Sequence, residues 1–170
     1  MIGAGGAGKT TVALELGRIL ALPVVHLDAL YWLPGWIPRT PGEWEALQRA
    51  ALAGDSWIAD GNFPGTMDLR LGRADTIVFL DLPRLLCLWR VLLRRRRQRG
   101  HARPDLPPGC VEGRIDRGFL AFLSEVWTFP HRGRPRLLER LVRYADGRDV
   151  VVLRSRTEVT RFLDCVRAAS

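Results

Sequence analysis

Three observations predict that this chain is an α/β domain with a parallel sheet. Apolar strand-like segments alternate with amphipathic helix-like segments along all 170 residues, without a repeat or a low-complexity linker. A glycine-rich segment, residues 3–10, stands directly before the first predicted helix, and aspartates follow three of the predicted strands. Alternation with almost uniformly apolar strands is typical of a parallel sheet that helices cover. The length suits one domain spanning 1–170.

The first third of the chain predicts two helices and a strand. Apolar residues recur at helical spacing over 10–20, and Pro23 ends that helix. Residues 24–27 follow as a short strand. Prolines and glycines around two tryptophans make 31–42 a structured loop, and 43–52 is the second helix.

The middle of the chain predicts two more strands and a strongly amphipathic helix. Residues 57–59 form a strand that runs into the turn signal Asp-Gly-Asn, and 76–80 form an almost uniformly apolar strand. The helix over 85–97 follows Pro83, a residue that suits a helix start. Residues 100–110 hold three prolines and two glycines and predict a loop.

The last third of the chain completes the alternation. Two helices are predicted near 112–127 and 135–145. They are followed by an apolar strand over 149–153 and a final helix over 158–168.

Residues 3–10 read Gly-Ala-Gly-Gly-Ala-Gly-Lys-Thr and match the phosphate-loop pattern G-x-x-x-x-G-K-[ST] at every fixed position. Glycines let the backbone approach a phosphate, and successive N–H groups at a helix N-terminus attract an anion. Lys9 is expected to bridge the β- and γ-phosphates of ATP, and Thr10 to give a hydroxyl ligand to Mg²⁺. The motif therefore predicts a P-loop NTPase of three layers. The positions expected to hold the nucleotide are Gly3, Gly5, Gly6, Ala7, Gly8, Lys9, Thr10 and Thr11.

The first strand is expected to be truncated at the N-terminus. A phosphate loop normally follows a strand of about five residues, whereas only Met1 and Ile2 precede Gly3. We therefore expect further apolar residues upstream of Met1 in the native gene.

The chain has 26 lysines and arginines against 18 acidic residues, a formal net charge of +8, yet Lys9 is its single lysine. A guanine-reading Asn-Lys-x-Asp motif and a protein-kinase fold with its own strand lysine are therefore excluded. Any reaction that needs an ammonium group must use Lys9. The positive charge predicts an acidic partner, and nucleotide phosphates, nucleic acid and a membrane surface all qualify.

Asp28, Asp60 and Asp81 each stand at the end of a predicted strand. Ligands of parallel α/β sheets bind outside the carboxyl ends of the strands, so these carboxylates are candidates to orient a substrate hydroxyl or the waters of Mg²⁺. The alternative for each is a helix cap or a turn residue. Asp81 is the most cap-like, because Pro83 follows it.

The helix over 85–97 carries a set of arginines. Arg90 and Arg94 lie four residues apart and share one face, so they are expected to clamp phosphoryl oxygens and neutralise transition-state charge. The basic run over 95–103 has two readings, a solvated face or a nucleic-acid contact.

Residues 26–32, 34–36, 57–63, 68–70 and 79–84 carry a resemblance to known proteins. The chain resembles the P-loop kinases of the adenylate-kinase-like group and, most closely, the DNA topology modulation proteins. The resemblance covers nearly the whole chain. It implies a five-stranded parallel sheet of order 2-3-1-4-5, numbered along the chain, and a short lid at about 98–110.

The resemblance also implies roles for single residues. Asp60 matches the aspartate that orders Mg²⁺ waters, and Arg90 and Arg94 match a phosphate-clamping pair. Arg156 falls in a loop that packs against adenine, and Arg132 or Arg134 would supply a second arginine set. The family's monophosphate-binding arginine is absent after Gly61, with Arg70 as a possible substitute. The region around Asp28 also resembles kinases of small hydroxylated metabolites.

These patterns predict a phosphotransferase that moves the γ-phosphoryl of ATP, with Mg²⁺, to a nucleotide or a small hydroxylated metabolite. The alternatives are a nucleic-acid-associated ATPase that acts on DNA topology, or a nucleotide sensor without turnover. No apolar run approaches the roughly 20 residues that a bilayer span needs. The three well-separated cysteines favour a reducing cytoplasm, where a monomer without a membrane partner is expected.

Overall fold

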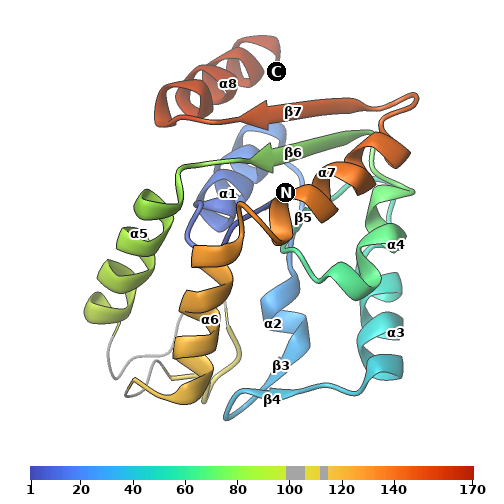
Figure 1. Cartoon of the computed structure of the whole chain (residues 1–170). Coiled ribbons are helices and arrows are strands. Elements are labelled where there is room, and N and C mark those ends of the chain that lie inside the picture. The colour runs from blue at the N-terminus through green and yellow to red at the C-terminus, as the bar shows by residue number, and fades with distance from the viewer. Residues whose placement is uncertain (99–105, 112–114) are drawn as a thin grey trace.

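The structure is a computed structural model that describes residues 1–98, 106–111 and 115–170. Helices pack around the parallel strands, and a short hairpin lies at the lower edge of the view (Figure 1). The helices are α1 (Lys9–Leu20), α2 (Leu27–Tyr31), α3 (Pro41–Ala51), the 3-10 turn η1 (Pro64–Thr66), α4 (Met67–Leu71), α5 (Arg84–Arg97), α6 (Arg117–Thr128), α7 (Gly133–Tyr144) and α8 (Arg156–Ala169). The strands are β1 (Ile2–Gly3), β2 (Val24–His26), β3 (Trp32–Leu33), β4 (Ile37–Pro38), β5 (Ile58–Asp60), β6 (Thr76–Leu80) and β7 (Asp149–Leu153).

The central strands are parallel and fall into two groups. One group has the order β1-β6-β7, and in it Ile77 of β6 pairs with Val150 of β7. The other group pairs β2 with β5, with Val25 opposite Ala59. The α/β prediction with parallel strands is therefore confirmed. Every neighbouring pair within these groups is also a neighbouring pair in the predicted order 2-3-1-4-5.

Met1 lies between the two groups of strands. Its α-amino group donates to the carbonyl of Ala59 over 2.8 Å, and its own carbonyl accepts from the N–H of Gly61 over 3.3 Å. These two bonds follow the pattern of a parallel ladder, but they involve one residue only. The described strands thus form a three-stranded sheet and two two-stranded sheets, and not one continuous five-stranded sheet. The physical reason is the length of β1, which has two residues.

Strand β6 shows that helices cover the sheet on both faces. Its last four residues, Ile77, Val78, Phe79 and Leu80, are all buried. Because successive side chains of a strand point to opposite faces, this burial needs cover on each side. Leu16 of α1 and Leu137 of α7 belong to the same hydrophobic core as β6. In the view of Figure 1, α1 lies behind β6 and α7 in front of it.

The predicted loop over 31–42 is wrong in part. It contains an antiparallel hairpin of β3 and β4, in which Leu33 pairs with Ile37. The turn is made by Gly35 and Trp36, which have φ values of 81° and 64°. Strands of two residues leave no alternating pattern, so the sequence shows only the turn residues. Helix α2 directly precedes this hairpin and was also missed.

Side-chain caps fix where several helices begin. The Thr40 hydroxyl and Glu43 form a reciprocal capping box at α3. The Asp116 carboxylate accepts from the N–H of Phe119 over 2.8 Å, so α6 begins at Arg117 and not near 112 as predicted. Residues 112–114 lie outside the described part of the chain.

Residues 106–111 attach the end of the predicted lid to the β3–β4 hairpin. The N–H of Gly35 donates to the carbonyl of Gly109 over 3.2 Å, and the Trp36 indole N–H donates to the carbonyl of Val111 over 3.1 Å. The Cys110 thiol lies 3.3 Å from the carbonyl oxygen of Leu33. Residues 99–105, where most of the predicted lid falls, lie outside the described residues.

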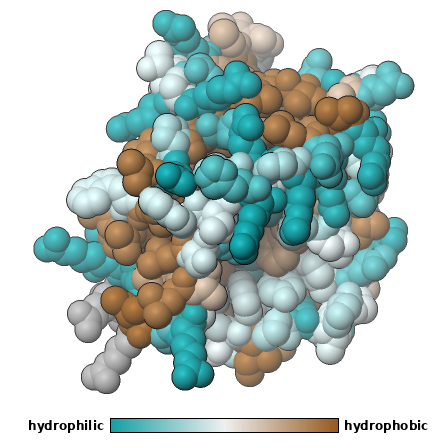
Figure 2. Space-filling model, in the orientation of Figure 1, coloured by the Kyte–Doolittle hydropathy of each residue, from teal (hydrophilic) through white to brown (hydrophobic). Residues whose placement is uncertain are grey.

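Hydrophobic side chains gather over α5 and α6, at the left of the space-filling view (Figure 2). Helix α5 exposes Leu85, Trp89 and Leu92, and α6 exposes Leu120. Among the described residues, no helix combines the length and apolar character needed to cross a membrane.

Candidate phosphate-transfer site

The glycine-rich segment forms a tight loop between β1 and α1. Gly3, Gly6 and Gly8 have φ values of 143°, 79° and 96°, in the region that favours glycine. Gly8 takes the N-cap position of α1 without a side-chain cap. The first N–H groups of a twelve-residue helix therefore lie at the end of the loop, an arrangement that attracts anions. Thr11 is exposed in the first turn of α1.

Packing against α5 and α6 requires two of the loop glycines. A Cβ on Gly5 would lie 2.6 Å from the ring of Phe122 in α6, and one on Gly6 would lie 2.3 Å from the carbonyl oxygen of Cys87 in α5. Helices α5 and α6 therefore lie directly on the loop. Both glycines stand at variable positions of the sequence motif, so their packing against α5 and α6 gives a reason for them that the motif does not.

The side chain of Lys9 folds back onto the start of the loop. Its Nζ donates to the carbonyls of Gly3 and Ala4 over 2.9 and 3.0 Å. Burial lowers the pKa of Lys9, while the charges of Asp60 and, less strongly, Asp28 act to raise it. The predicted lysine and the two predicted strand-end carboxylates thus lie in one electrostatic neighbourhood.

Asp60 ends β5 as a buried carboxylate. Its Oδ2 lies 3.4 Å from Nδ1 of His26, and the Thr10 hydroxyl lies close enough to act on it. Burial raises the pKa of Asp60, but hydrogen bonding from His26 and Thr10 and the charge of Lys9 outweigh it, so the pKa lies below its usual value. Asp60 is therefore ionised at neutral pH.

The Oδ1 atom of Asp60 is buried, and no described residue forms a hydrogen bond with it. A buried carboxylate oxygen without a partner is costly, unless a water or an ion completes it. A carboxylate beside a hydroxyl offers the hard oxygen ligands that Mg²⁺ prefers. Thr10 and Asp60 therefore fit the predicted magnesium site. Within the described residues, no three His, Cys, Asp or Glu side chains gather as a metal site of their own.

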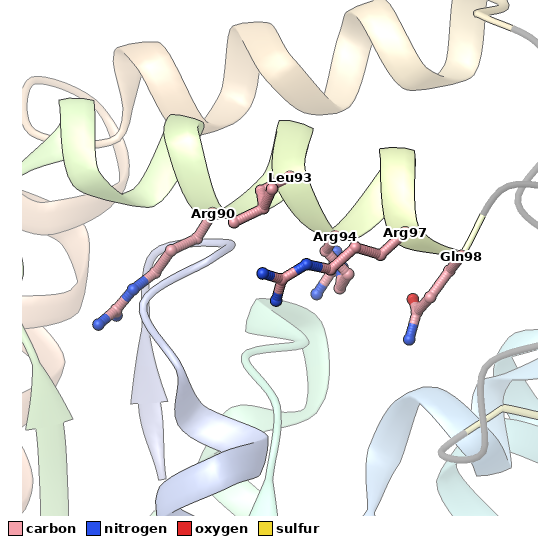
Figure 3. A pocket seen from close by; sticks show the side chains of 5 residues that line it. All are labelled: Arg90, Leu93, Arg94, Arg97 and Gln98. Carbon is pink, nitrogen blue, oxygen red and sulfur yellow. The ribbon is translucent and has the colours of Figure 1, made fainter.

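Arg90 reaches the loop from α5. Its guanidinium donates to the carbonyl of Ala7 over 3.0 Å and lies 3.5 Å from the position that a Cβ on Gly8 would take. Arg94 lies one turn further along the same face and, with Arg90, lines a cavity of about 260 Å³ (Figure 3). The structure thus brings both predicted clamp arginines to the loop side of α5.

Asn62 is a site residue that the sequence presents only as part of a turn. Its Oδ1 accepts from the N–H of Gly3 over 3.0 Å, and its Nδ2 donates to the carbonyl of Gly3 over 2.7 Å. The side chain therefore pairs with Gly3 as a neighbouring strand would. Its position directly after the strand-end Asp-Gly pair is the signal that could have identified it.

Arg70 holds the turn that carries Asn62. It is 4% exposed, and its guanidinium donates to the carbonyls of Asn62 and Gly61 and to Oε1 of the buried Gln48. Burial lowers the pKa of Arg70 to about 10. This guanidinium is bonded to the protein itself, and the suggested role of Arg70 as a substitute phosphate-binding arginine stays a prediction.

Asp81 does not cap a helix. Its carboxylate accepts from Nε of Arg134 over 2.9 Å and lies 3.9 Å from Nε of Arg154. Pro83 takes the N-cap position of α5, without a side-chain bond. The cap expectation for Asp81 is therefore wrong, because an arginine 53 positions away pairs with it. Arg156 is exposed at the start of α8, and its contact with adenine stays a prediction.

No protein-family model and no curated protein sequence matches the chain. The resemblance to the DNA topology modulation proteins therefore stays a prediction.

Three solved structures are similar to the chain along nearly its whole length. They are shikimate kinase from Bacteroides thetaiotaomicron (18% identity, TM-score 0.49, covering 98% of this chain and 94% of that one), a gluconokinase from Sinorhizobium meliloti 1021 (18%, 0.46, 99% and 94%) and a sugar kinase from Janibacter sp. HTCC2649 (14%, 0.44, 98% and 87%). These are distant similarities of the backbone trace.

Proposed function

We propose that this protein is a phosphotransferase that binds ATP with Mg²⁺ and moves its γ-phosphoryl to a small hydroxylated acceptor. The convergence of Lys9, Thr10 and Asp60 on one glycine-rich loop, with Arg90 against it, is the observation that carries the proposal. A loop with left-handed glycines at a helix N-terminus suits phosphates, and the orphaned Asp60 oxygen beside Thr10 suits the metal.

The cations of the site act on the transferred group. Lys9 exchanges the carbonyls of Gly3 and Ala4 for phosphate oxygens when nucleotide binds. Arg90 and Arg94 neutralise charge on the γ-phosphoryl from the α5 side. Mg²⁺, held by Thr10 and through water by Asp60, would neutralise charge on the β- and γ-phosphates.

Asp28 is assigned to the acceptor. It stands on α2, just past the carboxyl end of β2, and acts electrostatically on Lys9. The acceptor oxygen attacks the γ-phosphorus, the bond from that phosphorus to the β–γ bridging oxygen breaks, and ADP leaves. The hydroxyl proton passes to the Asp28 carboxylate. Arg156 is assigned to the adenine base.

We take the parallel strands as one sheet of order β2-β5-β1-β6-β7. The two Met1 bonds between β5 and β1 support this order. It sets the carboxyl ends of β2, β5 and β1 side by side, and those ends carry Asp28, Asp60 and the loop.

The free cysteines Cys87, Cys110 and Cys165 suit the cytoplasm.

A DNA-associated ATPase is the alternative that the basic run suggests. In the described part of that run the arginines point in different directions. Arg95 lies over the ring of Phe119 at 3.7 Å, while Arg94 and Arg97 line the cavity. This dispersal argues against one continuous phosphate-tracking face.

The test is an ATP-consumption screen with Mg²⁺ over nucleoside monophosphates, nucleosides and small hydroxylated metabolites. We expect acceptor-stimulated ADP formation together with a phosphorylated acceptor. Asp28→Asn should lower turnover on the acceptor by about 100-fold or more, in the range of a general base, with ATP affinity little changed. The proposal would be contradicted if no acceptor stimulated ADP formation by the wild type, or if Asp28→Asn kept full turnover.

A further inference from the structure

The cavity beside the phosphate loop is lined by more than the two clamp arginines. Among the described residues its lining is formed by Arg90, Leu93, Arg94, Arg97 and Gln98, which belong to α5 and the residue that follows it. In Figure 3 the polar side chains among them leave α5 on the side that faces the loop after β1. Residues 90, 94 and 97 are spaced by four and three, so they form one stripe along the helix.

The stripe extends well beyond the phosphate loop. Arg90 lies at the loop, where it is bonded to Ala7. Arg97 is seven residues further on, about 10 Å along the helix axis. The γ-phosphoryl is served at the loop by Lys9, Arg90 and Arg94, so Arg97 at the far end is placed for a second anionic group.

Gln98, at the same end of the cavity as Arg97, needs a hydrogen-bond donor. Its Oε1 atom is buried and has no hydrogen-bond partner among the residues that the structure describes. This atom only accepts hydrogen bonds, whereas a guanidinium only donates them. A ligand that satisfies both residues needs an anionic oxygen for Arg97 and an O–H or N–H donor for Gln98.

We propose that Arg97 and Gln98 form the subsite that selects the phosphoryl acceptor, and that this acceptor is a hydroxylated compound carrying a carboxylate or phosphate group. The inference rests on the proposed function and deepens it. Arg97 holds the anionic group, Gln98 accepts from a hydroxyl of the acceptor, and a second hydroxyl of the acceptor is left to face the γ-phosphoryl at the loop. Neutral polyols lack the group that Arg97 binds.

Matched pairs of probes test the charge requirement. The pairs are gluconate with sorbitol and glycerol 3-phosphate with glycerol, titrated calorimetrically into the whole protein with and without a non-hydrolysable ATP analogue and Mg²⁺. We expect the anionic member of at least one pair to bind about 10-fold or more tightly than its neutral partner, the range of a charge-assisted hydrogen bond. Equal binding within both pairs, or no binding of either anion, would overturn the proposal.

Variants on α5 test the residues. Arg97→Gln should weaken the anionic probe by about 10-fold, and Gln98→Leu should weaken it by about 5-fold through the lost hydroxyl partner. Arg96→Gln is the matched control, because Arg96 is exposed on the same helix and does not line the cavity. It should bind the probe as the wild type does. A loss in Arg96→Gln equal to that in Arg97→Gln would show a general charge effect and overturn the subsite.

The nucleotide arm separates this inference from the proposed function. Arg97→Gln should bind the ATP analogue as the wild type does. A loss of analogue affinity that matches the loss of probe affinity would assign Arg97 to the donor phosphates and overturn the subsite. Failure of the wild type to bind the analogue would instead contradict the proposed function. The titrations of the probes without nucleotide, in the wild type and in the Arg97 and Gln98 variants, would still test the subsite.

Discussion

Asn62 and Gly3 show how a single side chain substitutes for a missing length of strand. Strand β1 ends at Gly3, and the two Asn62 bonds satisfy both backbone groups of that residue. Gly3 also accepts from Lys9, so the position of Asn62 and the position of the loop lysine are linked through one residue. The start of the phosphate loop is therefore held by a side chain from the turn that follows β5.

Asn62→Ala removes both bonds to Gly3. Each bond is worth about 1 kcal/mol, so the free energy of unfolding should fall by about 1–3 kcal/mol in a urea titration. ATP affinity should fall as well, because the loop loses its anchor. Asn62→Asp retains the acceptor for the Gly3 N–H and loses the donor. Its free energy of unfolding should therefore lie between those of the wild type and Asn62→Ala. A stability equal to that of the wild type in Asn62→Ala would contradict this role.

Asp60 predicts a pH dependence of stability. Its pKa in the folded protein lies below its usual value, so the ionised form stabilises the fold at pH values above the unfolded pKa. This contribution is lost as the pH falls below about 4 and through the folded pKa. The free energy of unfolding of the wild type should therefore fall more steeply in this window than that of Asp60→Asn. Parallel curves for the two proteins would show that Asp60 is not stabilised in the fold.

At the scale of elements, the phosphate loop depends on α5 and α6 lying directly on it. Gly5→Ala should cost about 1–3 kcal/mol in unfolding free energy, because its Cβ would meet the Phe122 ring at 2.6 Å. Phe122→Leu in the Gly5→Ala background should recover part of this loss. Gly42→Ala is the matched control, since Gly42 lies in α3 with no atom within 4 Å of its added Cβ. Equal effects at positions 5 and 42 would contradict the packing role.

The elements that the sequence predicts well are those with local signals. The uniform apolar run of β6, the helical spacing of α1 and the loop motif are all readable from neighbouring residues. The β3–β4 hairpin and the short α4 were missed, because elements of two and five residues have no measurable period.

Contacts between distant segments explain what the sequence could not show of the site. Motif, strand end or helix face predicts a site role for Lys9, Thr10, Asp28, Asp60, Arg90 and Arg94. Three contacts join residues between 8 and 59 positions apart. They are the pair of Asp81 with Arg134, the bond of Arg70 to Asn62 and the bonds of Asn62 to Gly3. Such pairs become visible only when the fold brings the segments together.

At the scale of the whole molecule, several arginines donate hydrogen bonds to backbone carbonyls of other segments. Arg39 donates to the carbonyl of Leu30, Arg73 to those of Leu52 and Gly54, and Arg148 to those of Gly72 and Ala74. A guanidinium presents several donors in a fixed fork, which suits groups of backbone carbonyls that a lysine could not reach together. The net charge of +8 therefore overstates the positive surface that is organised for an external partner.

The different directions of the arginines at the end of α5 predict that DNA does not stimulate ATP turnover. Adding double-stranded DNA at low salt should leave ATP turnover unchanged, because the described basic run has no continuous face. The measurement is turnover with and without DNA over a series of salt concentrations. Stimulation that falls steeply with salt is the behaviour of a phosphate-tracking protein, and it would favour the DNA-associated alternative.

The central claim is that the loop around Lys9 binds ATP with Mg²⁺, and equilibrium binding of ATP tests it most directly. Lys9→Ala removes the chain's only ammonium side chain, with Arg96→Gln as a control for the loss of one positive charge. The account predicts that Lys9→Ala weakens Mg²⁺-dependent ATP binding by about 10-fold or more, the range of a charge-assisted contact, while Arg96→Gln binds as the wild type does. Equal ATP affinity in Lys9→Ala and the wild type would contradict it.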